Sequence, residues 1–343
     1  MATEWKEQAE QCIEASRRAA AWLRQQQLAD GAWKGLEAPP VDAYYKVGCA
    51  FNLAGEGVAA ERTFNYVRRH FLQSDGDFAP RAGAWHREVH YQYANGWLVI
   101  GAQKQGRYDI AVPALRFLLT QQDIRHGGFY SLRAEAGQVQ RSDTMSSGIA
   151  GVACLAAGQL ETARRVAKYY ERLIALQPAP QERFFTTLDA DGTLVTQFPD
   201  DQAKWRVVET KKEDQCWYAV GLPFAFAVLL SQATGEKRCA DLAQWFFDFQ
   251  MRCVNPWDGG SSGKAGWGCS MLYRMTGHAR YRAIALHIAD NIMANQLPTG
   301  RIVWGGLSGY GVNETVLSNR DFDITAEFSI WLGLIGMNLL AGE

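Results

Sequence analysis

A loose repeat of apolar segments, each ending in a glycine, constrains the fold of this 343-residue chain more than any other feature. A glycine directly after an apolar run is a helix stop signal, because it adopts the left-handed conformation without steric penalty. Segments such as GWLVIGAQKQG and GLPFAFAVLLSQATG therefore predict helices that are apolar on nearly every side. The glycines that end the six segments are Gly55, Gly106, Gly158, Gly235, Gly277 and Gly342.

A second, amphipathic helix is predicted before each apolar one. ERTFNYVRRHFLQ and RCADLAQWFFDFQMR, for example, place apolar residues at i, i+3, i+4 and i+7 with charges between them. Most of these helices run into a turn rich in glycine and aspartate. Because a helix that is apolar all round must be covered on every side, the six apolar helices are expected to form an inner ring. We therefore predict a single all-α domain over residues 1–343, an (α/α)6 barrel or toroid of six helical hairpins; an open α-solenoid is the alternative.

The fourth repeat is longer than the others. Its extra residues, 177–212, contain ERFFTTLDADGTLVTQF, in which β-branched and aromatic residues alternate around Asp-Gly. That pattern is typical of a β-hairpin. We expect a hairpin excursion at one rim of the barrel, placed to act as a lid.

Composition limits the partners of the chain. A formal charge of −1 argues against nucleic acid or an anionic membrane surface as a partner, since neither sign dominates. No apolar run approaches the roughly 18 residues of a membrane span. The seven cysteines form no CxxC pair, and the N-terminal segment is acidic and polar, which favours a cytoplasmic protein with reduced thiols. A small-molecule substrate is the expected partner.

Polar residues gather at the predicted N-terminal ends of the inner helices, which in a barrel converge on one face. Lys46, Asn95, Ser146 and Lys264 belong to this set. Converging positive helix ends and several carboxylates make this face the predicted site. The candidate catalytic residues are Asp323, Asp321, Asp143, Asp214 and His90. The candidate substrate-binding residues are Tyr44, Tyr45, Trp97, Arg141, Trp217, Tyr218, Trp267, Glu327 and Trp331.

Helix capping is the alternative role for each aspartate, because a side-chain oxygen at a helix start satisfies free N–H groups. Asp143 and Asp214 each allow this reading. For Asp321 and Asp323 one cap explains one residue only. We therefore predict that Asp323 is a cavity-facing acid, with Asp321 as its cap or electrostatic partner.

No metal or cofactor is predicted. His86 and His90 stand at i and i+4 with Glu88 between them, a spacing that suits a metal pair on one helical face. A third ligand is not apparent nearby in the sequence. The site is therefore expected to work with side chains alone.

Several motifs resemble the terpenoid cyclases and the protein prenyltransferase β-subunits, which share a toroid fold. QQQLADGAWKG and QQDIRHGGFYS are similar to the repeat of that superfamily, and residues 321–326 resemble the cyclase motif Asp-x-Asp-Asp-Thr-Ala without its last aspartate. The resemblance implies that Asp323 donates a proton to an alkene or epoxide. Arg320–Thr325 also resembles the prenyltransferase motif Arg-Asp-Phe-Tyr-His-Thr, and EDQCWYAVG resembles its Asp-x-Cys-Tyr segment, with Asp214 and Cys216 as zinc ligands. Ile324 replaces the zinc-binding histidine, so we predict no stoichiometric zinc.

A second resemblance is to six-hairpin sugar-active enzymes. LYRMTGHARYRAIALHIADNI and LLSQATGEKRCADLAQWFFDFQ are similar to their hairpins. Those enzymes often place catalytic carboxylates at the starts of inner helices. The resemblance implies such a role for Asp42, Asp143 and Asp214.

Two chemistries therefore compete. The main prediction is an enzyme that catalyses an acid-assisted cyclisation or isomerisation of a functionalised small molecule in specialised metabolism; its acid needs a pKa raised by burial or by a like charge. The alternative is a sugar-active hydrolase, lyase or epimerase with paired carboxylates, and a non-catalytic binding toroid is a further one. A dry, aromatic inner surface would favour cyclisation, and a wet one with paired carboxylates would favour sugar.

Overall fold

The structure is a computed structural model that describes residues 4–81, 89–135, 137–304 and 316–342. Its long helices form six hairpins, each an outer helix followed by an inner one, as predicted. The outer helices are α1 (Glu4–Gln26), α3 (Gly57–His70), α6 (Tyr108–Thr120), α8 (Leu160–Ala175), α11 (Lys237–Met251) and α13 (Ala279–Met293). The inner helices are α2 (Val47–Ala54), α5 (Gln92–Gln105), α7 (Thr144–Ala156), α10 (Tyr218–Thr234), α12 (Gly263–Thr276) and α14 (Asn319–Leu340).

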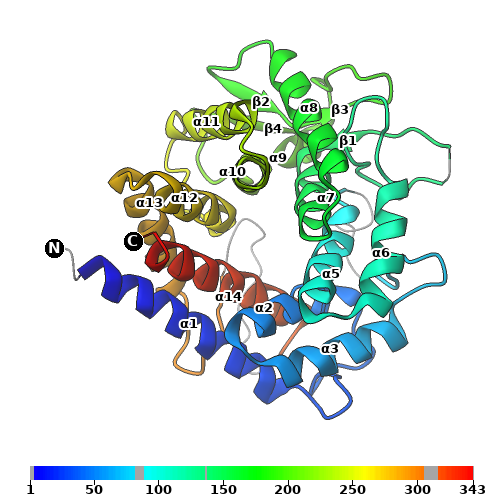
Figure 1. Ribbon diagram of the computed structural model, residues 1–343, viewed down its shortest axis with the longest axis vertical. Coiled ribbons are helices and arrows are strands. Elements are labelled where there is room, and N and C mark those ends of the chain that lie inside the picture. The colour runs from blue at the N-terminus through cyan, green and yellow to red at the C-terminus, as the bar shows by residue number, and fades with distance from the viewer. Residues whose placement is uncertain (1–3, 82–88, 136, 305–315, 343) are drawn as a thin grey trace.

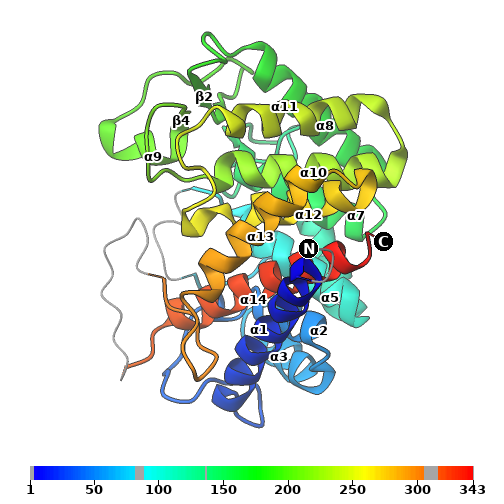
Figure 2. The same ribbon diagram turned by 90° about the vertical axis from the view of Figure 1, so that its left-hand side faces the viewer.

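The inner helices close into a ring (Figure 1). Each contacts the next in the order α2, α5, α7, α10, α12, α14, and α14 contacts α2 again. The first outer helix, α1, packs along α14, so the first and last hairpins of the chain join the two ends of the ring. In both views α8 and α11 lie outside α10 (Figure 1, Figure 2). The predicted closed barrel is thus confirmed, and the open solenoid is wrong.

Inner and outer helices differ in burial as their sequences predict. The inner helix α5 buries eleven consecutive residues, Gln92–Ala102. The outer helix α8 instead buries Ala163, Val166, Ala167 and Tyr170 on one face and exposes charged residues on the other. An apolar helix inside and an amphipathic helix outside is the arrangement that removes most apolar surface from water.

Turns after the outer helices pack against neighbouring outer helices. The turn after α1 is closed by an antiparallel bridge between Gln27 and Trp33, and the turn after α13 by one between Gln296 and Ile302. Gly300 in the second turn has a left-handed backbone, with φ 96°. A β-carbon there would lie 2.3 Å from the backbone oxygen of Arg18 in α1. The turn that follows the last outer helix therefore packs directly on the first.

Replacing Gly300 by alanine is expected to lower the free energy of unfolding by about 2–4 kcal/mol, the sum of left-handed strain and a backbone clash. Gly277→Ala is the matched control, because Gly277 also has a left-handed φ, 69°, but a β-carbon there meets no described atom within 4 Å. The control should cost about 1 kcal/mol. Urea unfolding of both variants measures the difference, and equal losses would contradict the close contact with α1.

The glycine stop signals hold at four helix ends in the expected form. Gly55, Gly106, Gly235 and Gly277 are left-handed C-caps of α2, α5, α10 and α12. At the other two helix ends the glycine follows the C-cap: Ala157 caps α7 before Gly158, and Ala341 caps α14 before Gly342.

The β-excursion of the fourth repeat is present, but its pairing differs from a simple hairpin. β2 (Arg183–Phe185) pairs with β4 (Val207–Glu209), which follows the short elements η2 (Asp200–Gln202) and α9 (Ala203–Arg206). β3 (Thr187–Leu188) pairs with β1 (Ser142–Asp143), and the Asp-Gly turn itself is closed by one bridge between Leu188 and Leu194. Strands β2 and β3 thus find partners outside the Asp-Gly turn, and β3 fixes the strand that leads into α7.

No helix in the described ranges combines the length and apolar character that a bilayer span needs.

Candidate active site

Two lysines and two acids form a cluster at the N-terminal ends of the inner helices. Lys46 directly precedes α2, Lys264 is the second residue of α12, and Asp323 and Glu327 lie one turn apart on α14. Lys46 Nζ lies 2.8 Å from Asp323 Oδ1 and also binds Glu327 Oε2. Lys264 Nζ lies 2.5 Å from Glu327 Oε1. We call these four residues the lysine–acid cluster, in which Glu327 binds both ammonium groups.

Burial and mutual attraction set the protonation of this cluster. Burial alone would raise the pKa of Glu327, but Lys264 and Lys46 hold it well below its ordinary value. Asp323 differs, because burial raises its pKa despite Lys46, and the like charge of Glu327 adds to the effect. Burial likewise lowers the pKa of Lys264, whereas Asp323 and Glu327 raise the pKa of Lys46. Glu327 is therefore held as an anion, whereas burial shifts the pKa values of Asp323 and Lys264 toward their neutral forms.

Aromatic rings surround the two ammonium groups. Lys46 Nζ lies 4.8 Å from the ring centroid of Tyr45 and 5.5 Å from that of Tyr93. Lys264 Nζ lies 5.4 Å from Tyr93, 5.7 Å from Tyr218 and 5.1 Å from Trp331. Ring faces attract cations electrostatically and shield them from water. The rings thus favour the charged form of each lysine and oppose the effect of burial.

A second pair, His90 and Asp143, lies at the starts of α5 and α7. His90 Nδ1 and Asp143 Oδ1 are 2.8 Å apart, and both side chains are buried. Asp143 also caps α7, accepting from the backbone N–H groups of Met145 and Ser146 and from Ser146 Oγ. Burial opposes its charge, yet His90 and these donors hold the pKa of Asp143 well below its ordinary value. An ionised Asp143 can only accept, so Nδ1 of His90 carries the hydrogen, and Nε2 is the nitrogen left to take a proton.

Tyr218 connects this pair to the lysine–acid cluster. The ring of His90 meets that of Tyr218 edge-on at 6.0 Å, and Tyr218 also contacts Lys264. His90 has a left-handed backbone, φ 55°, which is uncommon for a residue with a side chain. Strained backbone of this kind is enriched at functional sites. A base oriented by a carboxylate and a group of ammonium donors therefore share one aromatic wall.

The question raised by two acids at the start of α14 has a structural answer. Asp321 forms a capping box with Ser318, and its other oxygen lies 2.5 Å from Arg301 Nη2. Asp323, one turn from Glu327, turns to Lys46 instead. These contacts give Asp321 a structural role as a cap. Asp321 was predicted to be either the cap or the electrostatic partner of Asp323. The like charge that raises the pKa of Asp323 comes from Glu327.

Four other predicted residues lie apart from the cluster. Asp214 is exposed in the loop before α10, with φ 49°, and Arg141 is half-exposed and pairs with Asp189 at 3.1 Å. Tyr44 stacks on Trp33 and Tyr66 toward the outer helices. The backbone N–H of Trp217 donates to Ser261 Oγ, and its buried ring packs against Gly259. Among the described residues, the partners of these four therefore lie outside the lysine–acid cluster, and their predicted roles stay predictions.

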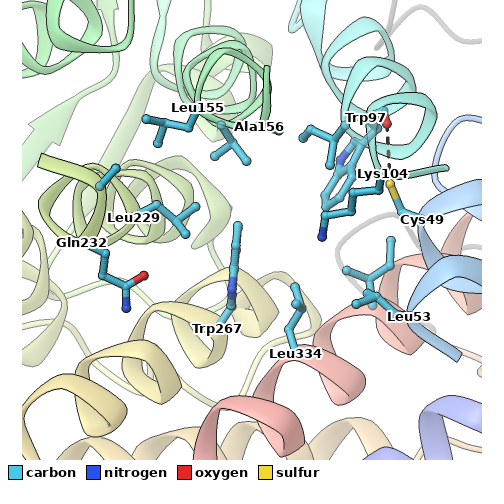
Figure 3. A pocket seen from close by; sticks show the side chains of 14 residues that line it. Cys49, Leu53, Trp97, Lys104, Leu155, Ala156, Leu229, Gln232, Trp267 and Leu334 are labelled. Carbon is cyan, nitrogen blue, oxygen red and sulfur yellow. Dashed lines mark hydrogen bonds between the residues drawn. The ribbon is translucent and has the colours of Figure 1, made fainter. Parts of the chain in front are cut away.

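The remaining predicted residues, Trp97, Trp267 and Trp331, form a layer beneath the cluster. The ring of Trp331 lies 5.6 Å from Trp97 and 5.8 Å from Trp267. Trp331 Nε1 donates to Glu327 Oε1 at 3.2 Å. Trp97 and Trp267 then line a cavity on the far side (Figure 3). The interior of the barrel is thus divided into a polar end and an apolar end.

Lys46 and Lys264 were predicted to lie at this face, but neither they nor Tyr93 were assigned a catalytic or binding role. The signal for such a role is a cation at the first turn of a helix otherwise apolar on all sides, since a buried ammonium requires a partner. His86 and Glu88, which belong to the His-x-Glu-x-His spacing considered for a metal, lie outside the described residues. The prediction of no zinc at Asp214 and Cys216 stays a prediction.

Acid is expected to weaken the fold through Glu327 and Asp143. Both folded pKa values lie below the unfolded ones, so the stability they supply is present above about pH 5 and is lost as pH falls through the folded values. Asp323, with its raised pKa, contributes in the opposite sense. The urea midpoint should fall steadily below pH 5. A midpoint unchanged between pH 7 and pH 3 would contradict the two ion pairs.

Comparison with known proteins identifies the fold. No protein-family model and no curated protein matches the sequence. A GH76 α-mannanase of Bacteroides thetaiotaomicron shares 15% identity over 97% of both chains, with a TM-score of 0.65. A D-mannose isomerase shares 12% identity over 94% of this chain and 96% of its own, with a TM-score of 0.66. The chain has the fold of these toroids.

A third similar structure is an α-1,6-mannanase of Salegentibacter sp., GH76A, inactivated at two aspartates and bound to α-1,6-mannotetrose. It shares 13% identity over 95% of this chain and 99% of its own, with a TM-score of 0.64. These structures support the predicted resemblance to six-hairpin sugar-active enzymes. They give no support to the predicted resemblance to terpenoid cyclases.

Proposed function

We propose that this protein is a sugar-modifying enzyme that moves a proton on a small sugar, as an isomerase or epimerase does. The observation that carries the proposal is the His90–Asp143 pair, which shares the Tyr218 wall with Lys264 and its cluster. The fold shared with a D-mannose isomerase and with mannanases supports a sugar as the substrate.

Each side chain has a task in this chemistry. Converting an open-chain aldose to a ketose moves a hydrogen from C2 to C1 through an enediol, and this needs a base at carbon and an acid at the carbonyl oxygen. His90 Nε2 is the base, because Asp143 holds the hydrogen on Nδ1. Asp323, whose pKa is raised by burial, supplies the proton to oxygen. The ammonium groups of Lys46 and Lys264 offset the negative charge that develops on that oxygen.

Glycoside hydrolysis is the second candidate, favoured by the mannanase fold and by the raised pKa of Asp323. It requires two carboxyl groups about 5–9.5 Å apart on either side of the scissile bond. Asp323 and Glu327 instead lie on one helix and bind the same Lys46, and Asp143 is committed to His90 and the α7 cap. The geometry therefore favours proton transfer.

The function is tested by incubating the protein with aldoses and ketoses in D2O and following the C2 proton by NMR. The expected result is conversion of one sugar into another, with deuterium at C2 of the aldose and at C1 of any ketose formed. A parallel incubation with α-linked mannooligosaccharides should release no reducing ends. Cleavage of the oligosaccharide without exchange at C2 would establish the second candidate and overturn the first.

The two aspartates of α14 provide a matched pair of variants. Asp323→Asn is expected to lower turnover by about 10²–10⁴-fold, the usual contribution of a positioned acid, with a thermal midpoint within a few degrees of wild type. Asp321→Ala should retain activity and lose about 0.5–2 kcal/mol of stability, the usual cost of a lost cap. Activity assays and thermal unfolding measure both. Normal turnover in the Asp323 variant would remove that residue from the mechanism.

A further inference from the structure

A cavity of about 410 Å³ lies within the barrel at the C-terminal ends of the inner helices. It is separated from the lysine–acid cluster by the tryptophan layer of Trp97, Trp267 and Trp331. All six inner helices contribute to its wall, so it lies on the axis of the barrel. The proposed chemistry makes no use of it.

The cavity has a buried floor and an exposed rim. Trp97, Trp267 and Ile330 on the floor are buried, whereas Lys104, Gln232 and Ala233 at the rim are exposed. Figure 3 shows Lys104 and Gln232 reaching in from α5 and α10 on different sides. A molecule can therefore enter from solvent and end on the two indole rings.

Electrostatics at this end restrict the charge of an occupant. Helix C-termini carry partial negative charge, and several converge at the rim, which disfavours an anion. The ammonium of Lys104 at the end of α5 disfavours a cation. Apolar side chains such as Leu53, Leu229 and Leu334 make up most of the wall, and an apolar site of this kind takes apolar ligands readily.

We propose that this cavity binds a neutral, largely apolar small molecule of about two or three rings, stacked on Trp97 and Trp267, with any polar group toward Gln232. The volume falls within the roughly 300–1,000 Å³ of small-molecule sites. Two indole rings provide flat surfaces for ring stacking. The cavity is distinct from the proposed sugar site, because the tryptophan layer separates the two.

Two dyes that share a naphthylamine core test the proposal. N-phenyl-1-naphthylamine is neutral, and 8-anilino-1-naphthalenesulfonate adds a negative sulfonate to the same rings. The neutral dye should bind at one site per chain, with fluorescence enhancement and energy transfer from tryptophan. The anionic dye should bind at least about tenfold more weakly.

Substitutions at the rim locate the site. Ala233→Trp fills the mouth from an exposed position of α10 and should weaken the neutral dye at least about tenfold. Ala175→Trp, on the exposed end of α8, is the control and should leave binding unchanged. Equal affinity for both dyes, no saturable binding, or unchanged affinity in the Ala233 variant would each overturn the proposal. Exchange at C2 of a sugar is measured separately, so either proposal can fail alone.

Discussion

Replacing Glu327 by glutamine is expected to destabilise the protein by about 3–5 kcal/mol, because it leaves two buried ammonium groups without their shared anion. Glu327 binds Lys46 and Lys264 and accepts from Trp331 Nε1. Both lysines are nearly inaccessible to water. Urea unfolding at pH 7 measures the loss.

Two controls separate this effect from a generic loss of charge. Asp241→Asn removes a carboxylate that pairs with Lys237 on the surface, and should change stability by less than about 0.5 kcal/mol. The double variant Lys264→Met with Glu327→Gln removes a buried cation together with the anion and should be more stable than Glu327→Gln alone. A double variant less stable than the single one would show that Glu327 does not serve mainly to neutralise Lys264.

Replacing Asp143 by asparagine is expected to lower sugar turnover by about 10²–10⁴-fold. Asparagine still caps a helix well, so α7 is preserved. The same oxygen, Oδ1, caps α7 and faces His90 Nδ1, so the amide oxygen of asparagine takes both places. The neutral amide no longer stabilises the positive charge that His90 gains when Nε2 accepts the proton. The rate of deuterium exchange at C2 measures the loss.

Ser146→Ala is the matched control for Asp143→Asn. It removes one hydrogen bond to Asp143 Oδ2 and leaves Oδ1 on His90 Nδ1. We expect less than about a tenfold change in rate, since the charge of Asp143 beside His90 is retained. If both variants retained wild-type exchange, the base would lie elsewhere.

The fold followed from local sequence signals. Alternating apolar and amphipathic helices, separated by glycine, leave few other ways to bury six apolar helices. The excursion in the fourth repeat was recognised for the same reason, but its partner strands were not. β3 pairs with β1, which precedes it by more than 40 residues, and no local pattern encodes that register.

The candidate site was predicted as a region more accurately than as a set of residues. Asp143 and His90 were each predicted separately, and the contact of α5 with α7 brings them together. Tyr44 and Tyr45 are neighbours with equal claims in the sequence. The backbone between them turns one ring toward the outer helices and the other toward Lys46.

The sequence by itself determined the six hairpins, the inner and outer rings and the end of the barrel where polar groups gather, because helix periodicity and stop signals act over a few residues. Only the tertiary structure decided which charges meet. Glu327 binds Lys46, 281 residues away, and Lys264, 63 residues away, so its partners depend on how the ring closes. The division of the barrel into a polar and an apolar end has the same origin, since Trp97, Trp267 and Trp331 come from three different helices. Burial then sets the protonation of these groups, and burial is a property of the closed barrel rather than of any one segment.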